Sequence, residues 1–463
     1  MGLLPAYFDK SRLIAPLGFS RWRVPPAALA IHLCIGQVYA FSVFNLPLSR
    51  LIGRTESAPG DWPLTTIGWI FSVAIVFLGL SAFTFGRWLE DAGPRKAMFA
   101  SAACFGGGFL IASLGVALHK IWIVYLGYGV LGGIGLGLGY ISPVSTLIRW
   151  FPDRPGMATG MAIMGFGGGA MVGAPLAVLL MNFFKSDSSP GVAQAFAAMG
   201  VLYFLFMMIG VMTVRLPAPG WRPAGWDPSH VSARRVAAPD VHVDQAIRTT
   251  PFWLLWVVLC LNVTAGIGVL GQASPMIQET FTGRIDASAA AGFVGLLSLA
   301  NMAGRFIWSS LSDRIGRKPT YMIYFALGAA LYASVPATGR AGSVVLFVLF
   351  YVLIMSMYGG GFATIPAYLR DRFGVMHVGA IHGRLLTAWS LAGVAGPVLV
   401  NYIREYQIRR GVPASGAYSF TMYLMGSLLV VGFIANWLVG NVDPQYHYTT
   451  EVQIPHEFRR TGA

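Results

Sequence analysis

Arg305 is the residue best suited to chemistry in this sequence, because it places a permanent positive charge in a hydrophobic stretch. Residues 289–300 before it are rich in Ala, Gly and Leu, and six residues separate it from the charged run at 312–318. A guanidinium matches a carboxylate, and charges inside a membrane segment commonly mark a transport path. We therefore expect Arg305 to anchor a carboxylate. The alternative is snorkelling toward the bilayer interface, roughly 9 Å away at 1.5 Å per residue.

Polar residues recur every three or four positions around Arg305, so they share one face of a helix. A face turned toward lipid has no reason to be polar. This polar stripe therefore favours a buried anchor over a snorkelling side chain. Its members are Ser298, Asn301, Arg305, Trp308 or Ser309, and Ser312.

Aromatic residues on other apolar segments are candidates to complete a substrate site. Tyr39, Tyr140 and Trp389 would form an apolar cage that also offers hydroxyl and indole donors. For each residue, ordinary packing or lipid contact is the alternative interpretation. Further candidate polar contacts are Asn301, Gln272 and His382.

His32 is a candidate proton relay, because it lies seven residues before Tyr39 and so near the same helix face. Histidine titrates near neutral pH. The alternative is a structural histidine held by hydrogen bonds. No acidic residue lies deep in an apolar segment, so the sequence indicates no other proton carrier.

Long apolar helices must position these side chains. Of the 463 residues, 56 % are hydrophobic and 11 % are charged, against about 25 % charged in a soluble domain. Apolar runs of about 20 residues recur along the chain, which is the length that spans a bilayer as helix. The sequence therefore predicts an all-α polytopic membrane protein with twelve spans. They are 24–47, 64–86, 96–118, 121–148, 156–183, 192–214, 251–279, 288–311, 319–338, 342–369, 379–403 and 416–440.

The charge distribution predicts the orientation. With the N-terminus inside, inner segments hold 22 Lys and Arg and outer segments hold 9, as the positive-inside rule requires. Both termini are then cytoplasmic and the cell (inner) membrane is the expected location. The N-terminal stretch shows no signal peptide. The expected domains are a cytoplasmic segment (1–23), a six-helix bundle (24–214), a cytoplasmic linker (215–250), a second bundle (251–441) and a cytoplasmic tail (442–463).

The two halves repeat at one constant offset in the numbering, which is the separation between Gly93 and Gly316. GRWLEDAGPRK (86–96) follows the second span and SSLSDRIGRK (309–318) follows the eighth. Because each half has an even number of spans, the halves run in the same direction and leave a central cavity between them. The same offset joins Pro143 to Pro366, Arg149 to Arg372, Gly156 to Gly379, and Gly160 to Gly383.

Each repeated loop carries a carboxylate, Glu90 or Asp313, at a helix end beside basic residues. Such charges can pair with a neighbouring helix end and separate when the halves rock. A solvated charged turn is the alternative. The loop residues are Gly86, Glu90, Asp91, Gly93 and Arg95 in the first copy, and Asp313, Arg314, Gly316 and Arg317 in the second.

The loop spacing Gly-x-x-x-acid-x-x-Gly-x-Arg resembles the signature of the major facilitator superfamily. The second copy has Ser309 for the first glycine, and the first copy has Asp91 where arginine is usual and Pro94 before Arg95. Longer stretches resemble the oxalate/formate antiporter family, which is related to the monocarboxylate transporters. They are GQVYAFSVF (36–44), GIGLGLGYISPVSTLIRWFPDRPGMATGMA (133–162) and FATIPAYLRDRFGVMHVGAIHGRLLTAWSLAGVAGP (362–397).

This resemblance implies a secondary transporter of two six-helix halves, in which an arginine at the place of Arg305 binds the substrate carboxylate. The oxalate transporter has a lysine where we align Trp389. A dianion would keep one charge unpaired beside a single cation. We therefore expect a small monocarboxylate such as formate, lactate or pyruvate. A dicarboxylate exchanger of oxalate type and an efflux carrier of a larger amphipathic compound are alternatives. Asn301 replaces an aspartate of the animal monocarboxylate transporters, so coupling to protons or to a counter-anion stays open.

Other motifs predict no further chemistry. GGIGLGLG (132–139) imitates a nucleotide-binding loop, but it lies in an apolar span without a preceding strand, where small residues let helices approach closely. Cys34, Cys104 and Cys260 lack the spacing of metal ligands. No His, Asp or Glu cluster indicates a membrane enzyme. We therefore expect no catalysis, cofactor, metal or nucleic-acid partner; the expected partners are a small carboxylate and the lipid bilayer, and the expected state is monomeric.

Overall fold

The computed structural model describes residues 7–53, 56–187, 189–227, 238–270 and 272–448. Within these residues the protein is almost entirely helical, and its β-pairing is limited to isolated bridges. Twelve of the described helices are long and apolar enough to cross a membrane. These findings confirm the predicted all-α fold of twelve spans.

The first half of the chain contributes six of these spans. The first and fourth spans are each built from several helical segments that run on without a break. The elements are α2 (Pro25–Ile35), η3 (Gly36–Phe44), α3 (Asn45–Leu48), α4 (Leu64–Ala92), α5 (Pro94–Ala117), α6 (Ile121–Val124), η4 (Tyr125–Gly132), α7 (Gly133–Trp150), α8 (Pro155–Phe184) and α9 (Val192–Thr213).

The second half contributes the other six spans and follows a linker that contains one short helix, α10 (Val243–Ala246). Two helices in succession build the eleventh span. The elements are α11 (Thr250–Leu270), α12 (Ala273–Thr280), α13 (Ala287–Ile315), α14 (Arg317–Arg340), α15 (Val344–Phe373), α16 (Val378–Leu385), α17 (Thr387–Arg409) and α18 (Ser419–Leu438).

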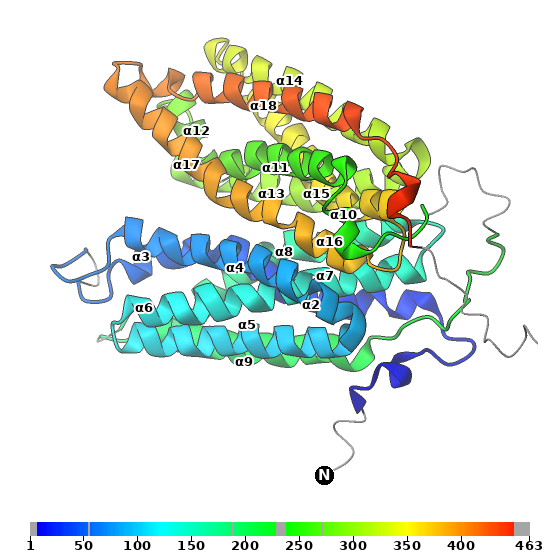
Figure 1. The fold of residues 1–463 in the computed structure, drawn as a ribbon. Helices are drawn as coiled ribbons and strands as arrows, with labels where there is room; N and C mark the ends of the chain where they lie inside the picture. Colours follow the sequence, from blue (N-terminus) through cyan, green and yellow to red (C-terminus); the bar gives the residue numbers. More distant parts are fainter. Residues whose placement is uncertain (1–6, 54–55, 188, 228–237, 271, 449–463) are drawn as a thin grey trace, which may run out of the picture.

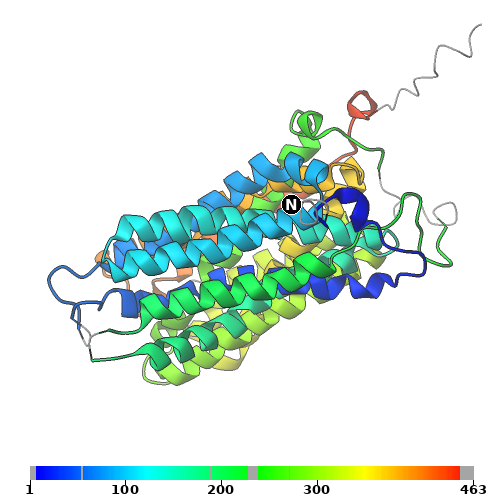
Figure 2. The same cartoon turned by 90° about the horizontal axis from the view of Figure 1, so that it is seen from below.

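The two halves form two helical bundles that lie side by side with their long helices running roughly lengthwise (Figures 1 and 2). Across the boundary, α8 packs on α13 and α15, and α4 packs on α16 and α17. The short helix α10 lies at one end of the molecule, which we call the linker side, and α3, α6 and α12 lie at the opposite end, the far side (Figure 1).

Two equivalent glycines set the helix ends on the linker side. Gly93 joins α4 to α5 with a φ of 86°, and Gly316 joins α13 to α14 with a φ of 93°. Backbone with positive φ favours glycine, because it has no Cβ to clash with the following carbonyl. The constant offset found in the sequence therefore corresponds to the same turn in each half.

Within the first span, the α-helix changes to a more tightly wound 3-10 helix over Gly36–Phe44, which is the stretch GQVYAFSVF. Gly36 sits against the backbone of Phe166 on α8, and a Cβ on Gly36 would overlap the Phe166 carbonyl oxygen. This close approach brings Tyr39 to the boundary between the halves.

The seventh span differs from the prediction of one helix over 251–279. Helix α11 ends at Leu270 and α12 begins at Ala273, with Gln272 as its N-cap residue. The sequence GQASP at 271–275 explains the interruption, because Gly and Pro disfavour a continuous helix.

Candidate functional site

The guanidinium of Arg305 lies inside the protein where the two halves meet. The side chain is 0 % exposed, so it does not snorkel to the surface. Its Nε donates to Asn301 Oδ1 one turn earlier on α13, at 3.0 Å, and its Nη1 donates to the Ile163 carbonyl on α8, at 3.2 Å. Nη2 is buried and has no hydrogen-bond partner among the residues that the structure describes. Among the ion pairs of the described residues, none includes Arg305.

Three aromatic rings surround this charge. The Cζ atom of Arg305 lies 5.9 Å from the ring centre of Tyr39, 5.7 Å from that of Phe166 and 5.2 Å from that of Phe362. Each cation–π contact contributes about 0.5–2 kcal/mol, depending on desolvation. The rings thus offset part of the cost of burial, but they supply no negative charge. We call Arg305 and these three rings the aromatic box.

Trp389 on α17 forms another wall of the aromatic box. Its buried ring lies 5.6 Å from Phe362, 6.2 Å from Phe166 and 6.4 Å from Tyr39, measured between ring centres. The Tyr39 hydroxyl lies 3.5 Å from that of Tyr358 on α15, which belongs to the other half. Residues of both halves therefore enclose the guanidinium.

Tyr140 and His382 lie next to the aromatic box. Both are buried, their rings are 5.6 Å apart, and the Tyr140 ring also lies 5.4 Å from Phe166. Within the described part of the chain, the Tyr140 hydroxyl and both ring nitrogens of His382 have no hydrogen-bond partner. A buried polar atom without a partner costs about 1–3 kcal/mol, so these atoms are suited to a polar ligand or water. His32 is also buried, and its ring centre lies 5.5 Å from that of Tyr140.

Two residues predicted near Arg305 lie in other surroundings. Gln272 occupies the N-cap position of α12 without a side-chain capping hydrogen bond; its backbone N–H donates to the Val269 carbonyl, and its carbonyl accepts from the Met276 N–H. Trp308 donates its indole N–H to Ser356 at 3.1 Å and packs on the Tyr324 ring, so it lies within the second half. Position 308/309 of the polar stripe is filled by Ser309, which is fully buried.

Glycines on α8 let α13 approach closely enough to place Arg305. A Cβ on Gly167 would lie 2.8 Å from the Arg305 Nε, and one on Gly160 would overlap the Ser309 Oγ. Larger residues would push the two halves apart here. No sequence pattern indicated a role for Phe166 or Phe362. Phe166 falls within the glycine-rich stretch GFGGGA (165–170), and Phe362 is the first residue of the stretch 362–397.

On the linker side, Asp313 joins the two halves. Its carboxylate accepts hydrogen bonds from the backbone amides of Gly156 and Met157, both at 2.8 Å, in the first turn of α8. It also pairs with Arg317 at 2.6 Å, and Arg317 in turn pairs with Asp371 at 3.1 Å. A carboxylate at a helix N-terminus satisfies free amides and meets the positive end of the helix dipole.

Glu90 makes the equivalent contact in the opposite direction. Its carboxylate accepts a hydrogen bond of 3.2 Å from the amide of Gly379, in the first turn of α16, and pairs with Arg149 in its own half. Gly379 and Gly156 are separated by the same offset in the sequence as Asp313 and Glu90, so they are equivalent positions of the two halves. Each half therefore caps a helix of the other half.

The remaining loop residues have separate roles. Arg95 is buried and donates to the carbonyls of Tyr7, Val211 and Val214, so it fixes the N-terminal segment against α9. Gly86 allows α4 and α16 to approach, because a Cβ there would lie 2.9 Å from the Ala380 Cα. Two further loop residues are exposed, and none of the ion pairs of the described part of the chain includes them; they are Asp91 and Arg314.

Part of the linker reaches both halves. We call residues 240–248 the linker clasp. Asp244 pairs with Arg384 of the second half and lies 3.6 Å from Arg87 of the first half. The hydrogen bond from Arg384 lowers the pKa of Asp244. Asp240 accepts from the amides of residues 375 and 376, at 2.7 and 2.9 Å.

Comparison with known proteins agrees with this arrangement. The sequence model of the Major Facilitator Superfamily matches residues 27–397 and 263–454. The chain therefore belongs to the major facilitator superfamily, and it is a membrane transporter of that class. Among solved structures, a proton:xylose symporter, XylE, aligns with a TM-score of 0.65 and 15 % identity over 93 % of this chain and 97 % of that chain, which supports the fold.

Relatives of this chain include two carboxylate transporters. The oxalate:formate antiporter of Oxalobacter formigenes is 24 % identical over 373 residues, covering 80 % of this chain and 81 % of the relative. The apicoplast pyruvate carrier 1 of Toxoplasma gondii is 24 % identical over 439 residues, covering 76 % of this chain and 78 % of the relative. The resemblance to the oxalate/formate antiporter family, which the motifs predicted, is thereby confirmed.

Proposed function

We propose that this protein is a secondary carrier of small monocarboxylates, of the formate, lactate or pyruvate type, and that Arg305 binds the substrate carboxylate. The observation that carries the proposal is the Arg305 Nη2 atom, which is buried at the junction of the halves without a hydrogen-bond partner among the described residues. A buried cation with a free donor and no paired acid is suited to an anion that enters from outside the chain.

The number of cations supports a monoanion. Aromatic rings enclose Arg305, and the neighbouring wall is the uncharged Trp389. A monocarboxylate would neutralise one guanidinium, whereas a dianion would bring an excess negative charge into a site of low dielectric. Of the two relatives described above, the pyruvate carrier agrees with a monocarboxylate substrate, and the oxalate:formate antiporter agrees with small carboxylates as a class.

The position of the site supports transport by alternating access. Arg305 contacts α8 of the other half through the Ile163 carbonyl, and Tyr39 faces Tyr358 across the same boundary. A carboxylate bound here would touch both halves, so its binding would favour their closure around it. On the linker side, the contacts of Asp313 and Glu90 hold the halves together.

Transport by purified protein in proteoliposomes tests the proposal. We expect uptake of labelled formate, lactate or pyruvate, with oxalate a poor substrate, measured with and without a pH gradient and with and without internal carboxylate. Arg305→Gln should abolish uptake, because it removes the charge. Arg409→Gln is the matched control, since its side chain is 80 % exposed, and should transport normally. Equal uptake by the two variants, or uptake of none of these carboxylates by the wild type, would overturn the proposal.

A further inference from the structure

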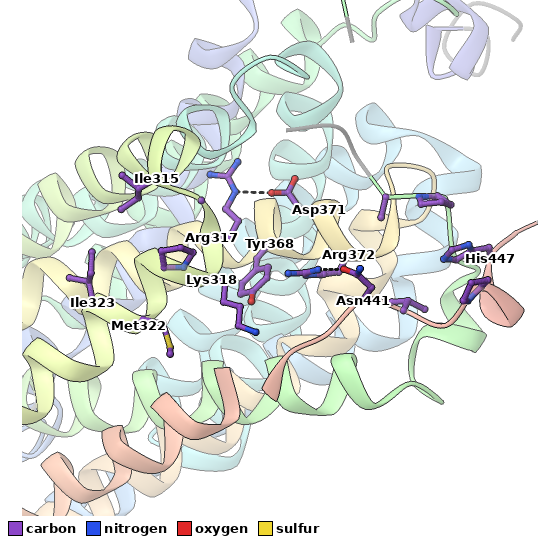
Figure 3. A pocket seen from close by; sticks show the side chains of 16 residues that line it. Ile315, Arg317, Lys318, Met322, Ile323, Tyr368, Asp371, Arg372, Asn441 and His447 are labelled. Carbon is purple, nitrogen blue, oxygen red and sulfur yellow. Dashed lines mark hydrogen bonds and ion pairs between the residues drawn. The ribbon is translucent and has the colours of Figure 1, made fainter. Parts of the chain in front are cut away.

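A cavity of about 1310 Å³ lies on the linker side of the second half, away from Arg305. The beginning of α14, the end of α15, the chain that follows α18 and linker residues 238–239 enclose it. Figure 3 shows the side chains that line it. It is larger than the roughly 300–1,000 Å³ typical of a site for one small ligand.

Two cations in this cavity lack an acidic partner among the described residues. Lys318 donates to the Val439 carbonyl at 2.9 Å, and Arg372 donates to the Asn441 side chain. Neither takes part in an ion pair with a described carboxylate. The positive charges of Arg372 and Lys318 repel each other. Figure 3 shows both side chains in the same part of the cavity. An anion between them would relieve this repulsion.

The other charges of the cavity are already balanced. Arg317 pairs with Asp313 and Asp371, and Asp371 also pairs with Arg370. These four residues carry two positive and two negative charges. The net positive charge of the cavity therefore comes from Lys318 and Arg372.

The opposite wall of the cavity is apolar and open to the exterior. It includes Met322, and Ile315 and Ile323, which are each 38 % exposed. Toward the middle of α14, the exposed apolar surface continues from Ile323 to Leu327. Leu327 is 39 % exposed and lies one turn further along the helix. In a membrane-spanning helix, such a face contacts lipid chains.

We propose that this cavity binds the headgroup of an anionic phospholipid, with the phosphate between Lys318 and Arg372 and the upper part of an acyl chain along Ile323. Charge complementarity favours an anion, and the apolar wall that leads onto the outer face of α14 favours an amphiphilic one. A basic pocket at the end of membrane-spanning helices is the setting in which anionic headgroups bind, and each Lys or Arg near the membrane surface adds to the attraction. The site is separate from the substrate site and does not depend on the proposed substrate.

Native mass spectrometry of the full-length protein in detergent tests the lipid site. Phosphatidylglycerol is titrated in competition with phosphatidylcholine. We expect the wild type to bind phosphatidylglycerol preferentially. The double variant Lys318→Gln/Arg372→Gln should bind it about tenfold to thirtyfold more weakly, as expected for the loss of two cations at a membrane surface.

Two matched variants separate this site from general charge and from misfolding. Lys96→Gln/Arg12→Gln removes two exposed cations from the first half on the same side, and should bind phosphatidylglycerol like the wild type. The charge-preserving variant Lys318→Arg/Arg372→Lys should restore most of the binding. If both Gln double variants lose the same affinity, the attraction is general and the cavity is not the site.

Two further measurements distinguish a lipid from a soluble anion. Inorganic phosphate and glycerol 3-phosphate at millimolar concentration should not displace phosphatidylglycerol, because they lack an acyl chain. Ile323→Ser should weaken the lipid by severalfold without changing any binding of phosphate. Complete displacement by inorganic phosphate would instead assign the cavity to a soluble anion, and equal binding of phosphatidylcholine and phosphatidylglycerol by the wild type would overturn the proposal.

Discussion

The Asp313 carboxylate accepts a hydrogen bond from the Gly156 amide, 2.8 Å away in the other half of the molecule. Glu90 and Gly379 repeat this relationship in the opposite direction, at 3.2 Å. Both contacts lie on the linker side, so that side cannot open until both are broken. We propose that the loop carboxylates thereby connect a local helix cap to the movement of whole halves.

Asp313→Asn should slow transport more than it weakens substrate binding. A neutral amide keeps an acceptor for Gly156, but hydrogen bonds to a charged group are roughly twice as strong as neutral ones. The linker-side-closed state would lose stability, while the aromatic box stays intact. We expect the maximal rate to fall about tenfold and the apparent affinity to change less than about threefold, from concentration-dependent uptake.

The matched control for this prediction is Asp153→Asn. Asp153 lies on the same side and pairs with Arg21 at 2.5 Å, but both residues belong to the first half. It should leave the maximal rate near that of the wild type. If Asp313→Asn alters only apparent affinity, the loop carboxylate does not serve the movement of the halves.

Trp389→Lys should move the substrate preference from monocarboxylates toward dicarboxylates such as oxalate. The Trp389 ring lies within 6.4 Å of the Tyr39, Phe166 and Phe362 ring centres, so a lysine there would add a second cation beside Arg305. Two cations balance a dianion. The ratio of oxalate to formate uptake, measured on protein of verified thermal stability, checks this prediction.

Trp308→Lys provides a comparison for the charge argument. Trp308 is on the same helix as Arg305, but it faces Ser356 and Tyr324 within the second half. It should not change the preference between mono- and dicarboxylates. A stable Trp389→Lys protein with an unchanged preference would show that the number of cations does not select the substrate.

Acidification should loosen the linker clasp. Burial, followed by the charge of His242, lowers the pKa of His377, which lies between α15 and α16. Nearby charges also include Asp240 and Asp91, which act in the opposite direction, and Arg87. Because the folded pKa lies below the unfolded value of 6.5, the stability that His377 contributes is present above pH 6.5. It is lost as the pH falls through the folded pKa.

Hydrogen exchange of residues 240–248 measures this effect. Amides of the clasp should exchange faster at pH 5 than at pH 7, after correction for the intrinsic pH dependence of exchange. His377→Gln removes the titrating group and should flatten the response. The lowered pKa of Asp244 keeps that carboxylate ionised over this range. An unchanged response in His377→Gln would assign the pH dependence to another group.

Single-cysteine labelling tests the orientation of the protein in the membrane. The inner segments carry 22 Lys and Arg against 9 outside, which predicts a cytoplasmic linker. Ala224→Cys in the linker should react in intact cells only with a membrane-permeant reagent. Glu56→Cys on the far side should react with an impermeant one, with the native cysteines replaced in both proteins. Labelling of Ala224→Cys by the impermeant reagent would show that the linker lies outside the cell and would contradict the predicted orientation.

Sequence patterns predicted the membrane spans, the repeated loops and the buried face around Arg305. Helix length and apolar composition predicted twelve spans, and the structure has twelve helices suited to cross a membrane among its described residues. The constant offset between the halves predicted equivalent loops, and Gly93 and Gly316 make the same turn with positive φ in the two loops. The polar stripe around Arg305 predicted a buried face, because polarity that repeats every three or four residues is a local signal.

Contacts between the halves could not be predicted in this way. Phe166 and Phe362 are ordinary apolar residues in their own helices, and they approach Arg305 only when α8, α13 and α15 pack together. Arg95 belongs to the predicted loop motif, but its guanidinium donates to three backbone carbonyls, which the motif did not indicate. Which partner a side chain meets depends on tertiary packing that no local pattern records.

The most direct test of the account is equilibrium binding of a labelled monocarboxylate to purified wild-type and Arg305→Lys protein. Lysine keeps the charge but loses the planar fork of donors. Loss of a charge-assisted hydrogen bond costs about 1.5–3 kcal/mol. We therefore predict that Arg305→Lys binds the carboxylate about ten- to a hundredfold more weakly while its thermal stability in detergent stays close to that of the wild type. A stable Arg305→Lys protein that binds the carboxylate as tightly as the wild type would contradict the assignment of Arg305 as the substrate anchor.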